Sequence, residues 1–430
     1  MAGTSRLGAP AAPTPLSRAA GPGFGTPPAD TGNPVLNWIS DALTALVRLE
    51  RRVDPFFRPA FDALLRDKLT QVVTDLINKQ RRDEGYALAE ERLQPGEEAQ
   101  LEAIISAFNA QMRRLWNPRY FERGGNTKTH AMVRAEFVVR NDVPERLRHG
   151  IFAEPKTYKA WVRYSGPGPI WCPDIDDIGF LSMAIKLMGV PGPKLMDDEK
   201  FTQDLFATSA PTFVTPDTRA NAQLQKWSYV NAPVFYFFNF QAPHILDSLM
   251  NSLWTKTQTS PLETEYFSTV PYLLGEDQAM KYSFHSRLRS RTPVPNLPGR
   301  PPDDYLRDAM VKTLARQDVE FDVCVQVQTD PFLMPIENAA VNWPTRLSPR
   351  VPVASVRIPR QTFDSPEQIA FARVLTYNPW HSIPEHQPLG NVSRARRRLY
   401  WEMSQLRIQM NQLRQYEPTG DEVFPGWTLP

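Results

Sequence analysis

The chain is poor in the features that mark several common classes of protein. Two cysteines in 430 residues, Cys172 and Cys324, cannot form a disulfide framework. Forty-nine Lys and Arg against 47 Asp and Glu leave a formal net charge of +2, so no strong field attracts nucleic acid. The longest apolar run, residues 234–240, contains Asn239 and is far shorter than the about 20 residues of a membrane-spanning helix. We therefore expect a cytoplasmic protein without a nucleic-acid partner.

The first 34 residues lack the apolar segment that a secretion signal requires. They are rich in Ala, Pro, Gly and Thr, their arginines are Arg6 and Arg18, and their first acid is Asp30. This composition predicts a disordered tail over residues 1–34. The late first acid leaves an organelle-transit segment open as the alternative.

Proline, by contrast, is abundant. The 42 prolines give nearly twice the usual share of about 5%. Because proline removes a backbone donor and breaks helices, this predicts long ordered loops around a core. A hydrophobic content of 41%, with 11% aromatic residues, is sufficient for a sizeable core in a chain of this length.

The spacing of the apolar residues changes within the first half of the chain. Apolar residues recur at helical spacing over residues 35–80, where Pro55 and Pro59 are predicted to interrupt the helices. These helices must pack their apolar side on something. A third helix is predicted over residues 97–115, and after the Gly-Gly turn that follows, the period becomes two, which is typical of a strand.

Residues 129–139 alternate between two faces, and His130 lies on the less apolar one, opposite the face of Ala131. Strands of this kind recur without the regular helices of βαβ units between them. We therefore predict an α+β fold built on an antiparallel barrel or sandwich. The further strand candidates are residues 160–165, 180–188, 324–328 and 354–358.

A short late helix is defined by its ends. Ser365 is followed by Pro and, three residues on, by Gln, which is the pattern of an N-cap with a capping box. Pro379 is predicted to end the helix. Tyr377 then falls in the last turn, with Arg373 one turn earlier on the same face.

The last predicted helix begins at residue 393 and ends near residue 413. One side is apolar, and the opposite side is basic through Arg394, Arg396, Arg397 and Arg398. A helix docked on the protein body is the first expectation for this pattern. A weak contact with a membrane surface, or with a partner protein, is the alternative.

His130 and Tyr377 together suggest a chemistry. Tyrosine is one of the side chains that hold haem iron, and because its reference pKa is about 10, ionisation at neutral pH needs a nearby cation such as Arg373. A neutral His130 could move a proton between the two oxygens of a peroxide. Ser165, on a neighbouring predicted strand, could bind the second imidazole nitrogen and set the tautomer.

This combination resembles the catalase superfamily over roughly residues 126–390, and more closely its branch with allene oxide synthase and small haem peroxidases. Thr129-His130-Ala131 is similar to the distal histidine motif. The strand at residues 161–165 resembles one whose arginine, here Arg163, meets a haem propionate in the family. Two further segments agree in order and residue type, at 179–187 and 203–213.

Residues 373–381 match the proximal signature Arg-x-x-x-Tyr-x-x-x-His with Arg373, Tyr377 and His381. The resemblance implies haem b with Tyr377 as the axial iron ligand and with Arg163, Arg373 and His381 on the cofactor. It also implies a catalase-like antiparallel β-barrel with surrounding helices and a haem pocket. The expected divisions are a tail (1–34), a helical segment (35–115), a barrel haem domain with the distal side (116–345), a wrapping segment with the proximal tyrosine helix (346–392), and a C-terminal helix and tail (393–430).

Two departures from the family pattern bear on function. Thr208 stands where the distal asparagine is expected, with Ser209 as the neighbour that could replace it, and Thr129 stands where typical catalases have valine. A hydroxyl beside the imidazole could restrain the proton shuttling that hydrogen peroxide dismutation requires. We therefore expect an enzyme for organic, fatty-acid hydroperoxides, acting as a peroxidase or as a hydroperoxide isomerase or dehydratase. The alternatives are a catalase and a haem-free scaffold protein, and the sequence admits a homo-oligomer.

Overall fold

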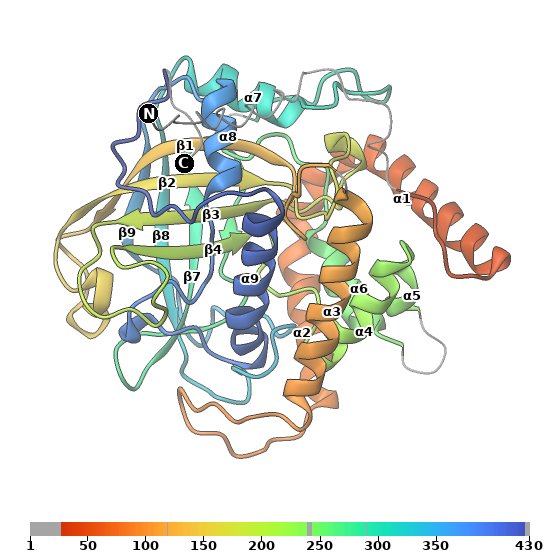
Figure 1. Ribbon diagram of the computed structural model, residues 1–430. Coiled ribbons are helices and arrows are strands. Elements are labelled where there is room, and N and C mark those ends of the chain that lie inside the picture. Colours follow the sequence, from red (N-terminus) through yellow and green to blue (C-terminus); the bar gives the residue numbers. More distant parts are fainter. Residues whose placement is uncertain (1–26, 118, 239–242, 290, 426–430) are drawn as a thin grey trace, which may run out of the picture.

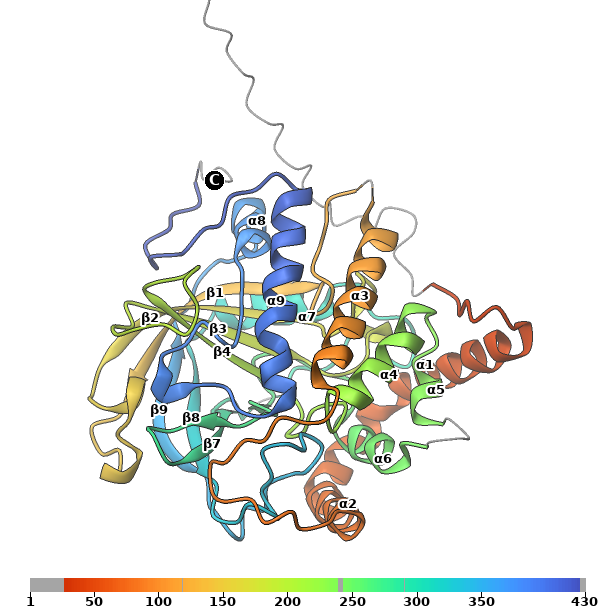
Figure 2. The same ribbon diagram turned by 60° about the horizontal axis from the view of Figure 1, so that its bottom comes forward.

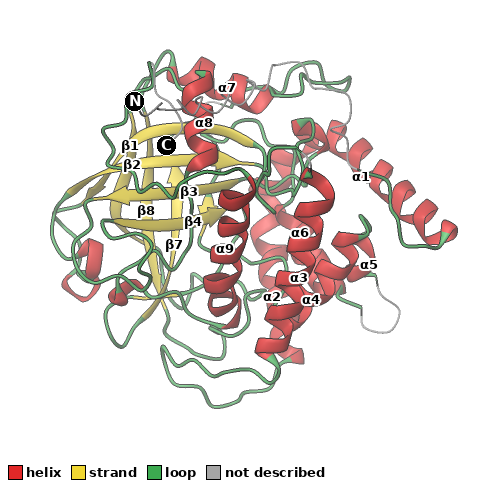
Figure 3. Cartoon of the chain, viewed as in Figure 1, coloured by secondary structure: helices red, strands yellow, loops and turns green. Residues whose placement is uncertain are grey.

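Nine strands form one antiparallel sheet in the computed structural model, which describes residues 27–425 except 118, 239–242 and 290. The order is β5-β4-β3-β2-β1-β9-β8-β7-β6, and a further pairing of β5 with β7 closes eight of the strands into a barrel (Figure 3). The bounds are β1 Thr129–Val139, β2 Thr157–Ser165, β3 Ser182–Met188, β4 Thr202–Thr208, β5 Tyr266–Phe267, β6 Tyr272–Leu273, β7 Ala279–Ser286, β8 Val319–Val327 and β9 Val351–Ile358.

The predicted alternation of β1 is confirmed. Ala131, Val133 and Phe137 lie in the main core cluster together with alternate residues of the other long strands. The predicted strands at 160–165 and 354–358 are confirmed within β2 and β9, and those at 180–188 and 324–328 overlap β3, which begins at Ser182, and β8, which ends at Val327. The α+β prediction is confirmed, and the barrel replaces the sandwich alternative because β5 joins β4 to β7.

Helices cover one side of the barrel (Figure 1). In Figure 2, α3, α4 and α9 lie side by side, and α3 packs on α9 through apolar residues that include Ile104, Ile105 and Leu399. The bounds are α1 Pro34–Phe61, α2 Asp67–Gln80, α3 Glu97–Trp116, α4 Thr218–Tyr229, α5 Val234–Phe237, α6 Ile245–Trp254, α7 Tyr305–Leu314, α8 Pro366–Val374 and α9 Asn391–Met410.

The predicted interruptions at Pro55 and Pro59 are wrong, because α1 continues through both prolines. Pro55 leaves the carbonyl of Arg51 without its helical donor. The Thr257 hydroxyl donates to that carbonyl, at 2.5 Å, and so replaces the missing hydrogen bond. A five-residue π-helical turn, η1 (Asp62–Arg66), then joins α1 to α2.

The C-terminal helix is docked, as the first expectation states. Leu399 and Leu406 are buried. The basic side is engaged within the molecule, since Arg394 pairs with Glu91, Glu97 and Glu337, while Arg398 pairs with three other glutamates. These contacts favour a structural role for the basic side over a membrane-surface role.

Among the described residues, no helix combines the length and apolar character needed to cross a bilayer. Of the expected tail, residues 1–26 lie outside the described part of the chain. The rest contacts the protein body: Ala29 is buried, and the Asp30 backbone N–H donates to Val230 O at 2.8 Å.

Candidate functional site

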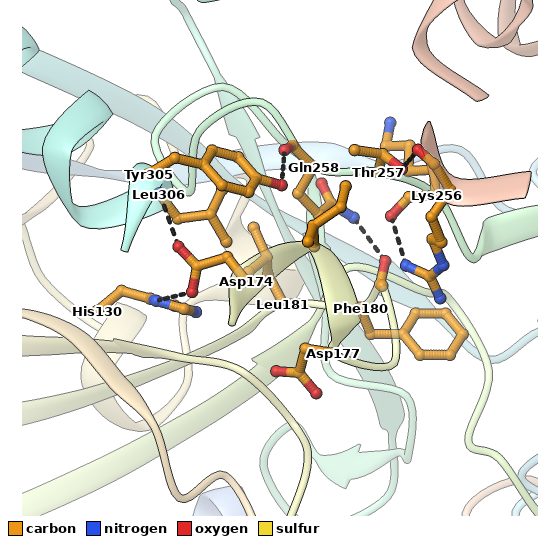
Figure 4. A pocket seen from close by; sticks show the side chains of 13 residues that line it. His130, Asp174, Asp177, Phe180, Leu181, Lys256, Thr257, Gln258, Tyr305 and Leu306 are labelled. Atoms are coloured by element: carbon orange, nitrogen blue, oxygen red, sulfur yellow. Dashed lines mark hydrogen bonds and ion pairs between the residues drawn. The ribbon is translucent and has the colours of Figure 1, made fainter. Parts of the chain in front are cut away.

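His130 lies at a bulge at the start of β1. Thr129 is opposite Ser165 on β2, and Ala131 is opposite Tyr164, so His130 has no residue facing it in the ladder. A bulge of this kind changes the direction of a side chain and is common beside functional sites. Here it points the His130 imidazole toward Asp174 (Figure 4).

The imidazole is 1% exposed, and neither nitrogen has a hydrogen-bond partner among the described residues. Its Nδ1 lies 3.6 Å from Asp174 Oδ1, beyond ordinary hydrogen-bond length. Burial, reinforced by the positive charges of Lys128 and Arg307, lowers the pKa of His130 well below its ordinary value. The ring is therefore neutral at neutral pH and can accept a proton.

Asp174 is held by a lysine that the sequence analysis did not assign to the site. Lys128 Nζ lies 2.6 Å from Asp174 Oδ1 and 2.9 Å from Asp304 Oδ1. Burial raises the pKa of Asp174 to about 6, although Lys128 opposes the shift. Lys128 thus holds Asp174 beside the imidazole.

A small cavity, with room for about one water molecule, adjoins His130 and Asp174 (Figure 4). Most of its lining is polar or charged, and the apolar side chains are those of Ile175, Phe180, Leu181 and Leu306. Arg51 reaches the cavity from α1 and donates to the backbone carbonyls of Ile178 and Lys256. Tyr377 does not belong to the lining of this cavity.

Arg163 binds the hydroxyl of Thr129, the residue before His130. Its Nε and Nη2 donate to Thr129 Oγ1 at 3.1 and 2.8 Å, and Nη2 also donates to Asn126 O at 2.6 Å. The Thr129 hydroxyl is therefore bound by the guanidinium. The expected hydrogen bond from Ser165 to the imidazole is not formed, because both imidazole nitrogens are without a partner among the described residues.

Thr208 ends β4 and turns toward its own chain, where its hydroxyl donates to Ala210 O at 3.3 Å. Ser209 has the closer link to the cavity. Its hydroxyl accepts from Leu181 N at 2.9 Å and from Gln258 Nε2 at 3.4 Å, and both of these residues line the cavity.

Tyr377 lies beyond the helix in which it was predicted. The Ser365 cap is confirmed, since its side chain accepts from the Gln368 N–H, but α8 ends at Val374. Two guanidinium groups, one half-buried and one buried, bind the carbonyl of Leu375 at this end: Arg123 donates to it at 2.7 Å, and Arg407 donates to it at 3.0 Å. Side-chain donors thereby take the place of a further helical turn.

The phenol of Tyr377 has a thioether as its neighbour. Its Oη donates to Met132 Sδ at 3.8 Å, and Lys186 Nζ lies 5.2 Å from the ring centre. Burial raises the pKa of Tyr377, while the charges of Lys186, Arg163 and Arg123 lower it. The phenol is therefore neutral in this state, with three cations placed to favour its ionised form.

Arg373, predicted to supply that cation, is directed elsewhere. It forms an ion pair with Glu122, and its guanidinium carbon lies 4.0 Å from the centre of the Tyr120 ring. Lys186, in the middle of the apolar strand β3, is therefore the first of the charges that lower the pKa of Tyr377.

His381 belongs to a buried ionic network behind Tyr377. Its Nδ1 lies 2.9 Å from Asp204 Oδ2, and its Nε2 lies 3.0 Å from Asp198 Oδ2. Burial lowers the pKa of His381, but Glu199 and the two aspartates outweigh it and raise the pKa to about 9. Glu199, Asp204 and His381 have the spacing of a metal site, yet Lys186 Nζ is already 2.7 Å from Asp204 Oδ1 and neutralises the carboxylates.

The histidine and tyrosine clusters adjoin at Arg163. Its charge lowers the pKa of both His130 and Tyr377, and its Cα is opposite that of Met132 on β1. Haem carries two carboxylates and an iron with two axial positions. Buried and half-buried arginines, an imidazole without a hydrogen-bond partner and a phenol bound to a thioether fit that group in chemistry. Met132 must turn aside for Tyr377 Oη to reach an iron.

Solved structures with this architecture identify the fold. A fungal catalase, determined at 1.9 Å, gives a TM-score of 0.53 at 14% identity, over 77% of this chain and 68% of that one. Catalase A from Saccharomyces cerevisiae gives 0.54 at 12%, over 77% of this chain and 70% of that one. The fold is that of the catalases. No protein-family model matches the chain, and no curated protein matches it in sequence.

Four residues of the site were not predicted from the sequence: Arg123, Lys128, Asp174 and Lys186. Lys186 carries a usable signal, because a lysine inside the apolar run of β3 must find a buried partner. Asp174 lies in an acidic stretch, residues 174–177, whose composition is typical of a solvent-exposed loop. Arg123 has no local signal, since its partners are carbonyls about 250 residues away.

Proposed function

We propose that the protein is a haem-dependent, peroxide-processing enzyme with the catalase fold. One observation carries the proposal: His130 is a buried, neutral imidazole whose two nitrogens have no hydrogen-bond partner among the described residues, beside a cavity, at the position that resembles the distal histidine. Burying a polar group without a hydrogen bond costs free energy of folding, and such groups are typical of catalytic sites.

Each residue of the site has a defined task in this proposal. Tyr377 would hold the iron, with Lys186 and Arg163 favouring the phenolate, and Arg163 and Arg123 would meet the haem carboxylates. Bound haem supplies the redox chemistry of peroxide reduction. His130 accepts a proton from the near peroxide oxygen and returns it to the leaving oxygen.

For the substrate, we propose an organic hydroperoxide, with fatty-acid hydroperoxides as the test class. Leu181 and Leu306 give the cavity beside His130 an apolar part that a carbon chain can contact, while polar and charged side chains form the larger part of its lining. Thr208 supplies no amide to orient a small peroxide, and its hydroxyl is turned to Ala210 O. Turnover would be by peroxidase or by isomerase or dehydratase chemistry.

The test compares two peroxides on the haem-loaded chain. The absorption spectrum is recorded first, and hydrogen peroxide and a fatty-acid hydroperoxide are then added in parallel while oxygen release and peroxide loss are followed. We expect a ferric haem that consumes the lipid hydroperoxide with little oxygen. Vigorous oxygen release from hydrogen peroxide would instead identify a catalase and overturn the substrate proposal.

A haem-free binding protein is the second candidate. It is favoured by the contact between Tyr377 Oη and Met132 Sδ, which occupies the side of the phenol that iron would need. Haem titration of the wild-type chain and of Met132→Ala separates the two candidates. If Met132 only covers the ligand, the variant binds haem more tightly. If neither protein shows a haem band, the enzyme proposal fails.

A further inference from the structure

Helix α1 is amphipathic, but its polar side faces the protein. Its buried residues are Ser40, Arg51, Asp54 and Arg58. Arg58 donates to Thr255 O at 2.9 Å, and the Asp54 carboxylate accepts from Thr257 N at 2.8 Å. Polar contacts therefore dock α1 on the protein body, and the apolar face is left outside.

The outward face is long and nearly continuous. Trp38 is 71% exposed, Phe56 is 69% exposed, and Leu46, between them, is 61% exposed. In Figures 1 and 2, α1 lies at the edge of the molecule away from the barrel. We call this face the α1 stripe; its large exposed residues are Val35, Trp38, Leu43, Leu46, Val47, Leu49, Val53, Phe56, Phe57, Leu64 and Leu65.

The π-helical turn η1 keeps the stripe on one side of the helix. A π-turn has one residue more than an α-turn. Leu64 and Leu65 carry the stripe through η1, and Leu69, Val72 and Leu76 of α2 follow at spacings of three or four residues. These three residues of α2 are also exposed, so the extra residue extends the apolar face into α2.

The stripe is large enough for a stable interface. Its eleven side chains are exposed by between 36% and 71%. Since a buried aromatic side chain contributes about 150–250 Å², the stripe offers on the order of 1,000 Å², against about 800 Å² per partner in a standard interface. Patches of this size on a soluble protein usually mark an interaction site.

The charges around the stripe favour a protein over an anionic lipid surface. Residues 34–61 contain no lysine, and two of their four arginines, Arg51 and Arg58, are turned inward. The exposed charged residues of α1 are acids: Glu50, and Asp41, whose Oδ1 accepts from the Ala29 N–H at 3.1 Å. A helix that lies on anionic lipid needs cations beside its apolar face. In α1, Arg51 and Arg58 are buried against the protein body and so cannot serve this purpose.

The remaining charges are arranged for a second copy of this chain. Asp41 and Arg52 are eleven residues apart, about three helical turns, and so lie on the same flank of the stripe. Their midpoint falls at Leu46 and Val47, in the centre of the stripe. A two-fold axis there makes the two helices antiparallel and brings Asp41 of each copy to Arg52 of the other.

We propose that the α1 stripe is the contact surface of a symmetric homodimer, in which antiparallel α1 helices pair about Leu46 and Val47. The Asp41 and Arg52 pairs fix the register, and the apolar residues supply the binding energy. The proposal is independent of the haem chemistry, because none of the residues of the α1 stripe belongs to the candidate site.

The test measures the molar mass of the full chain by light scattering after size exclusion, over a range of concentrations. We expect a dimer for the wild type and a monomer for Leu46→Glu, which places two carboxylates at the axis, with at least a tenfold weaker association. Leu93→Glu, at a site outside the stripe that is 81% exposed, is the control and should remain dimeric. Circular dichroism and thermal denaturation check that the variants are folded.

The charge pairs provide a second, independent readout. Arg52→Asp should weaken the dimer at low salt, and adding Asp41→Arg should restore it. A wild type that stays monomeric, a dimer insensitive to Leu46→Glu, or an absence of rescue would each overturn the proposal. A monomer that binds phosphatidylcholine vesicles through Leu46 would assign the stripe to a membrane instead.

Discussion

His130 combines three properties that a proton-shuttling group needs: burial, neutrality and nitrogens without a hydrogen-bond partner among the described residues. The neutrality follows from burial and from Lys128 and Arg307, whose positive charges disfavour a further cation. Asp174 does not reverse this effect, because it is already paired with Lys128. The local charges therefore keep the imidazole a base.

We predict that His130→Ala retains haem but loses at least about 100-fold in peroxide turnover, the usual contribution of general acid–base catalysis. Stopped-flow mixing with the hydroperoxide measures the loss. Because the pKa of His130 is lowered, the wild-type rate should not fall when the pH is lowered from about 7 to about 6. His244→Ala, distant in the sequence and paired with Asp247, is the control. Unchanged turnover in His130→Ala would remove the histidine from the mechanism.

We also predict that Tyr377→Phe fails to retain normal haem, because the substitution removes the phenol oxygen and leaves the ring. Haem titration followed by absorption measures the affinity and the spectrum. Tyr120→Phe alters another tyrosine beside the same arginines and should bind haem as the wild type does. A wild-type spectrum in Tyr377→Phe would show that the oxygen is not the ligand.

Helix α8 shows how a local signal positions part of the site. Its beginning is set by Ser365 and the following proline, which the sequence predicts, and its end is set by Arg123 and Arg407, which come from distant segments. Side chains from distant parts of the sequence therefore hold the segment that carries Tyr377. Thr376 adds a hydrogen bond from its hydroxyl to Glu199, at 3.0 Å.

For this helix, we predict that Ser365→Ala lowers the free energy of unfolding by about 1 kcal/mol, the usual value of an N-cap. The Gln368 N–H loses its acceptor in this variant. Denaturant unfolding measures the change. Ser365→Asp keeps a capping oxygen and should restore most of the stability. Equal destabilisation by both variants would mean that the cap contributes nothing.

Across the barrel and its surrounding helices, the network around His381 joins β3, β4 and the segment after α8. The pKa of His381 is raised to about 9 from an ordinary value of 6.5. A raised pKa means that protonation stabilises the folded state. The contribution is complete below about pH 6.5 and is lost as the pH rises through about 9.

We therefore predict that His381→Gln destabilises the protein by up to about 3 kcal/mol near pH 6, and by much less above about pH 9. Thermal denaturation of the variant and of the wild type over this range measures the difference. Taking the difference removes the effects of other titrating groups, such as Lys281, whose pKa burial lowers to about 7. A difference that does not change with pH would show that His381 is neutral in the folded protein.

The features of this protein that the sequence predicts are those determined by residues close together along the chain. The period of two in residues 129–139 follows from one face being buried, and the cap at Ser365 follows from the orphan N–H groups of the first helical turn. The family resemblance in the order of motifs likewise predicted the barrel, while the chemical roles of His130 and Tyr377 stay predictions. Local composition and spacing are sufficient for such features.

The remaining features depend on contacts between segments far apart in the sequence. The short strand β5 closes the barrel, a bulge directs His130, and Arg123 and Arg407 end α8 before Tyr377. Periodicity also could not show that α1 docks through its charged side, because it identifies an apolar face without identifying what covers it. Such outcomes follow from which distant groups satisfy each other's charges and hydrogen bonds, and only the packed chain brings those groups together.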